Sequence, residues 1–222
     1  MWILIALPLT LVLLALVHCY LQEDLILSRK NLRDKFAAFI PKKPIYILYL
    51  LCVFIAGIAV FGVQYRYFSD YIKAAKLTVL ILLLAPVAYI DFKNRIIPDK
   101  VLLVALLLRI VFYLLEFFIG RKEIAEILVP DFKGVLLGSG VLMLGTLIAK
   151  DSIGIGDIKM YGIIGLFASY SGTSSSMILS LFICSFVSII LLVFKKKGRR
   201  DTLPLAPFAL VGTFIATIIG SC

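Results

Sequence analysis

Long apolar runs separated by short polar segments dominate the chain and predict a bundle of membrane-spanning helices. A helix needs about 20 residues to cross the hydrocarbon core of a bilayer. The predicted spans are residues 2–18, 44–63, 74–90, 101–119, 134–149, 160–170, 175–194 and 205–220. The run at 160–170 is short and contains glycine, so we expect it to be tilted, broken or partly re-entrant. The expected fold is an all-α polytopic membrane protein with about eight transmembrane helices.

Composition agrees with a single integral membrane domain over residues 1–222. The chain is 62% hydrophobic with a mean hydropathy of +1.09, whereas soluble domains are about 45–50% apolar. The net charge of +10 raises the question of nucleic acid. The basic residues lie in short loops between apolar runs, where they act as topology signals. We therefore expect the lipid bilayer, and no nucleic acid, as a partner.

The distribution of basic residues predicts the orientation in the membrane. With the N-terminus outside, the inside loops 19–43, 91–100, 150–159 and 195–204 hold 16 Lys and Arg residues. The outside loops, residues 64–76 and 120–133, hold 6 Lys and Arg residues. Cytoplasmic loops carry the excess of Lys and Arg, so this orientation is favoured.

Loop 19–43 is the longest polar segment, and it carries six basic residues. Two interpretations stay open: a short amphipathic helix on anionic lipid, or a solvated cytoplasmic loop. About 25 residues are too few for an independent folded domain without a metal or disulfides.

Two aspartates border apolar runs and are the main candidate site residues. Asp91 interrupts the run at Tyr89-Ile90-Asp91-Phe92, and Asp157 follows Gly154 and Gly156 beside another span. Ionisable groups at membrane depth are costly, so each is a functional-site hypothesis by default. The two glycines leave room for close approach of backbone or substrate. A structural alternative for Asp91 is pairing with Lys93 or Arg95 at the membrane interface.

Pro98, Asp99 and Lys159 have simpler structural interpretations. Pro98 suits the first turn of the helix that follows, and Asp99 is then an early-turn acid favoured by the helix dipole. Lys159 is positioned to anchor its helix start at the lipid headgroups, and a direct part in catalysis is the weaker interpretation.

A close pair of carboxylates suggests one reaction, the hydrolysis of a peptide bond. Two close carboxylates do not both ionise cheaply, so one keeps a proton and the pair titrates as a unit. The ionised member takes a proton from water while the protonated member hydrogen-bonds the scissile carbonyl. His18 is the only histidine, so no Ser/His/Asp or Cys/His set competes. We expect neither a metal nor another cofactor.

Three motifs resemble those of the type IV prepilin peptidases, a family of GxGD-type aspartic proteases. Residues 154–160, Gly-Ile-Gly-Asp-Ile-Lys-Met, look like its G-x-G-D-x-K signature. Asp91 followed by Arg95-Ile96-Ile97-Pro98-Asp99 resembles its first motif. Residues 203–208, Leu-Pro-Leu-Ala-Pro-Phe, resemble the Pro-rich start of its last span. The family has Gly where Ala206 stands. The likeness covers roughly residues 60–220.

This resemblance implies that Asp91 and Asp157 are catalytic, with Gly154, Gly156, Lys159, Pro98 and Pro207 supporting the motifs. It implies cleavage of the basic leader of prepilins or pseudopilins at the cytoplasmic face of the bacterial inner membrane. Many members also N-methylate the new amino terminus, and in those the first cytoplasmic loop carries two C-x-x-C pairs. Loop 19–43 contains a single cysteine, Cys19, and therefore no C-x-x-C pair. We therefore expect a short form without the zinc-bearing methyltransferase loop.

Three other interpretations account for the two acids less well. A small proton- or ion-coupled transporter also places acids and Gly-broken helices in the membrane, but its acids should lie near the midplane within repeated halves. Presenilin-like proteases pair G-x-G-D with Tyr-Asp, whereas Ile90 precedes Asp91 here. A noncatalytic assembly protein would leave both acids without a role.

Overall fold

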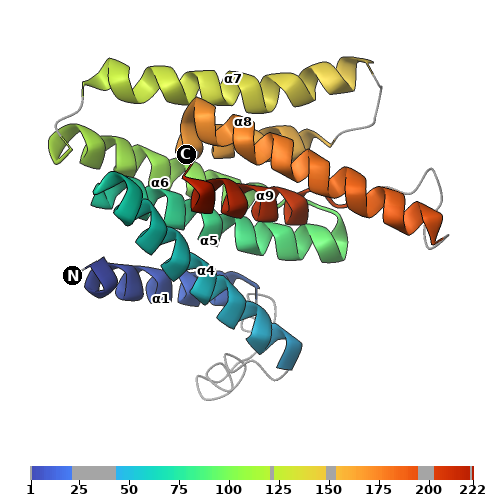
Figure 1. The fold of residues 1–222 in the computed structure, drawn as a ribbon, viewed down its shortest axis with the longest axis horizontal. Helices are drawn as coiled ribbons and strands as arrows, with labels where there is room; N and C mark the ends of the chain where they lie inside the picture. Colours follow the sequence, from blue (N-terminus) through green and yellow to red (C-terminus); the bar gives the residue numbers. More distant parts are fainter. Residues whose placement is uncertain (1, 22–43, 121–122, 149–153, 195–202, 221) are drawn as a thin grey trace.

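The computed structural model describes residues 2–21, 44–120, 123–148, 154–194, 203–220 and 222 (Figure 1). Its helices are α1 (Trp2–Leu21), α4 (Pro44–Phe68), α5 (Tyr71–Asn94), α6 (Asp99–Phe118), α7 (Ile124–Ile148), α8 (Ile155–Val193) and α9 (Ala206–Ile219). Five of them, α4 to α8, are long and apolar enough to cross a membrane, while α1 and α9 contribute shorter apolar helices. The predicted all-α polytopic fold is confirmed, but the expected count of eight spans is not.

Two helices begin earlier in the chain than the predicted spans, because the prediction took nearby charged residues as part of the loops. The predicted span 134–149 corresponds to α7, which already begins at Ile124 and takes in Asp131 and Lys133. In the same way α5 begins at Tyr71 and takes in Lys76. The prediction left Asp131 in the loop 120–133 and counted Lys76 with the outer loop charges, although the span 74–90 contains it. Both side chains are buried inside the bundle. Much of the outer loop charge therefore belongs to helices.

The predicted spans 160–170 and 175–194 are two arms of α8 that meet at Ser169. Ser169 has φ 57° and ψ −166°, far from helical values. A Cβ built on Gly138 would lie 2.6 Å from Tyr161 O and 3.2 Å from Thr173 Cγ2. A continuous helix would separate residues 161 and 173 by about 18 Å. The chain therefore folds back at Ser169, and the first arm, residues 155–168, is about 21 Å long, too short to cross the hydrocarbon core alone.

Close backbone approach holds α7 against this folded-back helix. A Cβ on Gly134 would lie 2.6 Å from Gly165 O and 2.7 Å from the carbonyl carbon of Ser169. Small residues permit such contacts between membrane helices. The first arm of α8 is thus fixed along α7.

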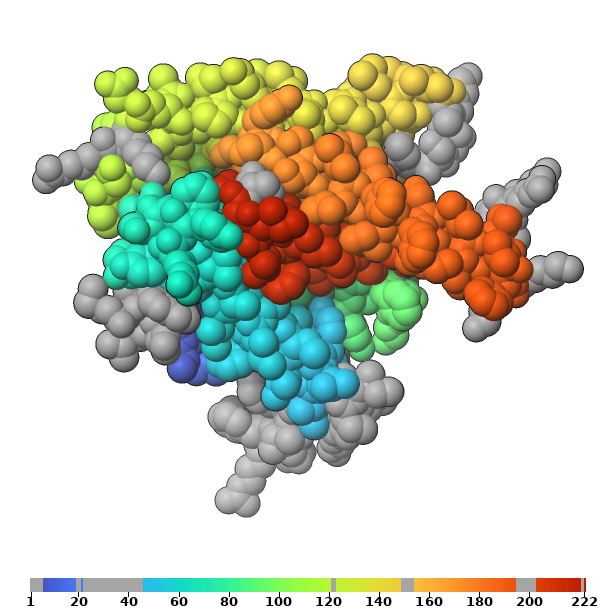
Figure 2. All heavy atoms as spheres, in the orientation of Figure 1, coloured from blue at the N-terminus to red at the C-terminus, as the bar shows by residue number. Residues whose placement is uncertain are grey.

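Helix α5 lies at the centre of the bundle and packs against α1, α4, α6, α8 and α9. It begins at Asp70, whose carboxylate accepts the N–H groups of Ile72 and Lys73 at 2.9 and 3.2 Å. It ends at Arg95, which adopts a left-handed conformation. Helix α9, the shortest, fills the space between α4 and α8 on the face shown in Figure 2. The core therefore surrounds the helix that carries Asp91.

Candidate active site

Asp91 lies one turn before the end of α5, against the start of α9. Its side chain is buried, and its Oδ2 accepts the Ala206 N–H at 2.9 Å. Ala206 is the first residue of α9, so its N–H has no partner within that helix. Pro207 sits in the same first turn, where its missing N–H costs nothing. The Pro-rich segment and the first aspartate thus meet at a helix N-terminus, which stabilises a carboxylate.

Asp157 lies in the first turn of α8, just after the glycine segment. The turn is closed by the Asp157 N–H, which donates to Gly154 O at 3.0 Å. A Cβ on Gly154 would lie 3.2 Å from Asp157 Oδ2. Gly154 therefore leaves room for the carboxylate to fold back over the start of its own helix.

The segment after Asp91 packs on the segment around Asp157. A Cβ on Gly156 would lie only 2.9 Å from Ile97 Cβ, so glycine is needed for this contact. Asp99 occupies the first turn of α6, as the sequence predicted, whereas Pro98 is the N-cap residue just before the predicted first-turn position. Lys159 Nζ lies 2.8 Å from Asp99 Oδ1. This ion pair joins the two motifs, and the headgroup-anchor role of Lys159 stays a prediction.

These contacts gather Asp91, Asp157 and Ala206 at one end of the bundle. In Figure 1 this is the right-hand end of α5 and α9. The negative charge of Asp91 disfavours ionisation of Asp157, and the positive charge of Arg95 favours ionisation of Asp91. The interaction with Arg95 leaves the structural alternative for Asp91 some support. Two acids, an amide donor and a glycine turn can together bind water and a peptide carbonyl.

An apolar groove begins beside this end and runs along α6, α7 and the first arm of α8. Its volume is about 970 Å³, and it is open to the outside. Its lining includes Asp99, Leu103, Leu106, Phe132, Ser139 and Lys159. Neither aspartate of the pair lines it, but Lys159 lies within one helical turn of Asp157. We call this feature the α6–α8 groove.

His18 lies nearer to the acids than its sequence position suggests. Its Nδ1 is 3.0 Å from Tyr46 Oη, and the Tyr46 ring lies 5.9 Å from the ring of Tyr89, two residues before Asp91. Within the described residues, no group of three or more His, Cys, Asp or Glu side chains is placed to hold a metal. The predicted loop 19–43 lies outside the described residues from residue 22 onward.

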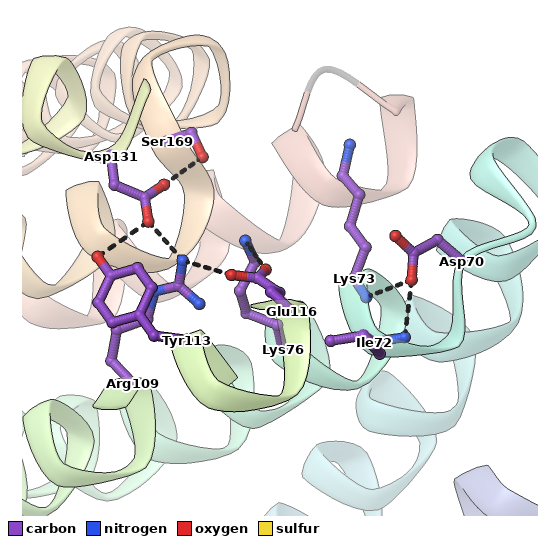
Figure 3. A network of polar contacts seen from close by, with 9 residues as sticks. All are labelled: Asp70, Ile72, Lys73, Lys76, Arg109, Tyr113, Glu116, Asp131 and Ser169. Carbon is purple, nitrogen blue, oxygen red and sulfur yellow. Dashed lines mark hydrogen bonds and ion pairs between the residues drawn. The ribbon is translucent and has the colours of Figure 1, made fainter. Parts of the chain in front are cut away.

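The sequence analysis missed a second set of charges, buried between α5, α6, α7 and the turn of α8 (Figure 3). It comprises Lys76, Arg109, Glu116 and Asp131, joined by ion pairs. We call these four residues the charge network. A signal was present in the sequence, because Lys76, Arg109 and Glu116 fall inside predicted spans. Arg109 and Glu116 are also two helical turns apart, on one face of α6.

Comparison with known families gives one match. The model of the type IV leader peptidase family matches residues 77–193, more than half of the chain. The matched region contains Asp91, Asp157 and most of the charge network. Searches of curated proteins and of solved structures gave no match.

Proposed function

The chain belongs to the type IV leader peptidase family, and we propose that it is a membrane aspartic endopeptidase that removes the basic leader of prepilins or pseudopilins. Membership of the family makes the protein a peptidase. Its long apolar helices make it a multi-pass membrane protein. The aspartic mechanism, the substrate and the side of cleavage are our proposal. Neither the family nor the described residues support the transporter alternative.

One observation carries the mechanism. Asp91 and Asp157 come from different helices, far apart in the sequence, yet the segment after Asp91 lies against the segment around Asp157. Close packing of Ile97 on Gly156 supports this approach, and so does the ion pair between Asp99 and Lys159. A shared proton between two such carboxylates is the basis of aspartic protease chemistry.

In the proposed reaction, the ionised carboxylate takes a proton from a water molecule as the water oxygen attacks the scissile carbonyl carbon. The protonated carboxylate donates a hydrogen bond to the carbonyl oxygen and stabilises the charge that develops there. The tetrahedral intermediate then breaks its C–N bond, and the departing amine takes up a proton from the pair. Each turnover consumes one water and restores the shared proton.

The α6–α8 groove is our candidate for the site that holds the apolar helix of the substrate. Cleavage occurs just before that helix in the substrates we propose, so the helix must lie beside the two acids. The groove starts at Asp99 and Lys159, within a turn of Asp157, and its walls are mainly apolar. Along α6 it extends from Asp99 to Tyr113, about 21 Å. This length matches some fourteen residues of a helix.

We place the two aspartates at the cytoplasmic face of the bacterial inner membrane. Lys93, Arg95, Lys100 and Lys159 lie close to them in sequence, and an excess of basic residues marks cytoplasmic loops. We also propose that the protein lacks N-methyltransferase activity, because Cys19 is the single cysteine of loop 19–43. Mass spectrometry of the processed amino terminus tests this, and methyl groups there would contradict it. Cleavage by two carboxylates needs no cofactor in this proposal.

The test of the function is co-expression with candidate prepilins, with loss of the leader followed on a gel. Asp91→Asn and Asp157→Asn should each abolish cleavage while the protein still inserts in the membrane. Glu126→Gln is the matched control, because Glu126 is an exposed acid on α7 and its loss removes the same charge. Full cleavage by either aspartate variant would overturn the carboxylate-pair mechanism.

A further inference from the structure

The charge network lies at the opposite end of the helices that carry the two acids. Lys76 Nζ is 2.9 Å from Glu116 Oε1, and Arg109 Nη2 is 3.0 Å from Glu116 Oε2. Arg109 also pairs with Asp131. All four side chains are at least nine-tenths buried, and their charges cancel.

Asp131 extends this network to the point where α8 folds back. Its Oδ1 accepts the Ser169 hydroxyl at 2.6 Å, and its Oδ2 accepts the Tyr113 hydroxyl at 3.1 Å. Figure 3 shows Asp131 between Arg109 and Ser169, with Tyr113 beside it. The Arg109 guanidinium lies 3.9 Å from the centre of the Tyr113 ring. The turn between the arms is therefore tied to α6 and, through Glu116, to α5.

The same two elements carry the candidate catalytic acids. Helix α5 holds Lys76 near its start and Asp91 near its end, about 22 Å apart. The first arm of α8 holds Asp157 near its start and reaches Ser169 about 18 Å later. The network joins the start of α5 to the end of the first arm of α8. The two acids lie at the opposite ends of these elements. A shift of the far end of such a short, rigid arm is transmitted to Asp157.

We propose that the charge network positions the acids: Asp131, through Ser169, sets the arm that carries Asp157 in register with Asp91. Asp131 and Ser169 are positioning residues, because neither touches the reacting atoms. This inference rests on the proposed function. It also explains why the site tolerates four buried charges, since apolar side chains would join the helices without the desolvation cost of ions.

A substitution at Ser169 can distinguish a role in positioning the acids from a role in stability. Its backbone conformation is one that only glycine adopts readily. A residue selected only to make the turn would be glycine, whereas serine adds a hydroxyl that donates to Asp131. Ser169→Gly therefore relieves backbone strain and removes the link to the network in one change.

The experiment compares purified wild type, Ser169→Gly and Asp131→Asn in the cleavage of a prepilin substrate. The folded fraction of each is measured by circular dichroism in the same detergent. We expect kcat per folded enzyme to fall by about 10- to 100-fold, the scale of an ångström-size misplacement, with KM unchanged. Ser169→Asn should recover part of kcat relative to Ser169→Gly, because Asn again offers a side-chain donor to Asp131, while its backbone, like that of serine, is strained at this position.

Thr10→Val is the matched control for loss of a buried hydroxyl. Thr10 is fully buried and donates to Ala6 O at 2.8 Å, within α1 and outside the network. Wild-type kcat in Ser169→Gly, or a loss explained entirely by the folded fraction, would overturn the positioning role. Cleavage that survives in Asp91→Asn would instead overturn the proposed function, so the two failures are distinguishable.

Discussion

The two ends of α5 differ in how their charged side chains are paired. At the Lys76 end, two cations and two carboxylates form ion pairs that leave no net charge. At the Asp91 end, Asp91 accepts the backbone N–H of Ala206, and the negative charge of Asp91 acts on a second carboxylate, Asp157. Both ends belong to one helix in one apolar bundle, so the surroundings alone do not explain the difference.

The difference indicates which end is built for chemistry. Buried charges are costly unless they are paired, and the network meets that cost through mutual pairing. An acid pair held close retains a tendency to bind a proton or a polar ligand. The variants that follow act on one end at a time, and should change either stability or cleavage.

The largest stability effect is expected for Arg109→Met in the charge network. It leaves Asp131 and Glu116 with one fewer cation in a buried site, and breaking a buried ion pair costs about 3–5 kcal/mol. Unfolding in detergent measures it. Lys93→Met, an exposed change at the other end of α5, should leave the unfolding free energy unchanged within about 0.5 kcal/mol. Equal effects of the two variants would show that the network is not a structural centre.

Gly134→Ala should destabilise the contact between α7 and the turn of α8. The new Cβ would meet backbone atoms of Gly165 and Ser169 at 2.6 to 2.8 Å, and such overpacking costs about 1–3 kcal/mol. Gly140→Ala is the matched change on the same helix, with nothing within 4 Å of its Cβ. It should be neutral or stabilising by up to about 1 kcal/mol. Loss of stability in Gly140→Ala alone would contradict the packing described for α7.

Leu106→Trp should block the α6–α8 groove and raise KM for the substrate by about tenfold, or 1.4 kcal/mol. Leu106 lines the groove and is 46% exposed. Leu107 is its neighbour, is 53% exposed and does not line the groove, so Leu107→Trp serves as the control. Steady-state cleavage of a prepilin measures both. An equal effect of the two variants would place the substrate helix elsewhere.

The smallest effect is expected for Lys159→Met. Its ion pair with Asp99 is exposed on both sides, and exposed pairs contribute about 0–1 kcal/mol. Stability in detergent should therefore change little, and it should change less still at high salt. A loss of several kcal/mol would show that the pair is a main support of the acid end.

Much of this arrangement was predictable from the sequence. Apolar runs predicted the helices, and acids next to apolar runs singled out Asp91 and Asp157. Their roles remain a proposal, but family membership is confirmed. The break in the 160–170 region was also expected, since a run this short does not cross a bilayer.

The charge network was not predicted, because its members look like loop residues or isolated charges when read along the chain. Lys76 and Asp131 mark span ends in a hydropathy pattern, and only tertiary pairing places them inside the bundle. The bond from Ala206 to Asp91 joins residues from opposite parts of the chain. No periodicity encodes such a contact, although the Pro-rich segment did indicate where α9 begins.

The central claim is that Asp91 and Asp157 act as one unit, and a double-mutant cycle tests it most directly. Cleavage rates of purified Asp91→Asn, Asp157→Asn and the double variant are compared with those of wild type. Residues that act together show non-additive losses. The account predicts a loss of roughly 10⁴-fold or more in each single variant, with no further loss in the double variant. Losses that multiply, or cleavage that persists in either single variant, would contradict it.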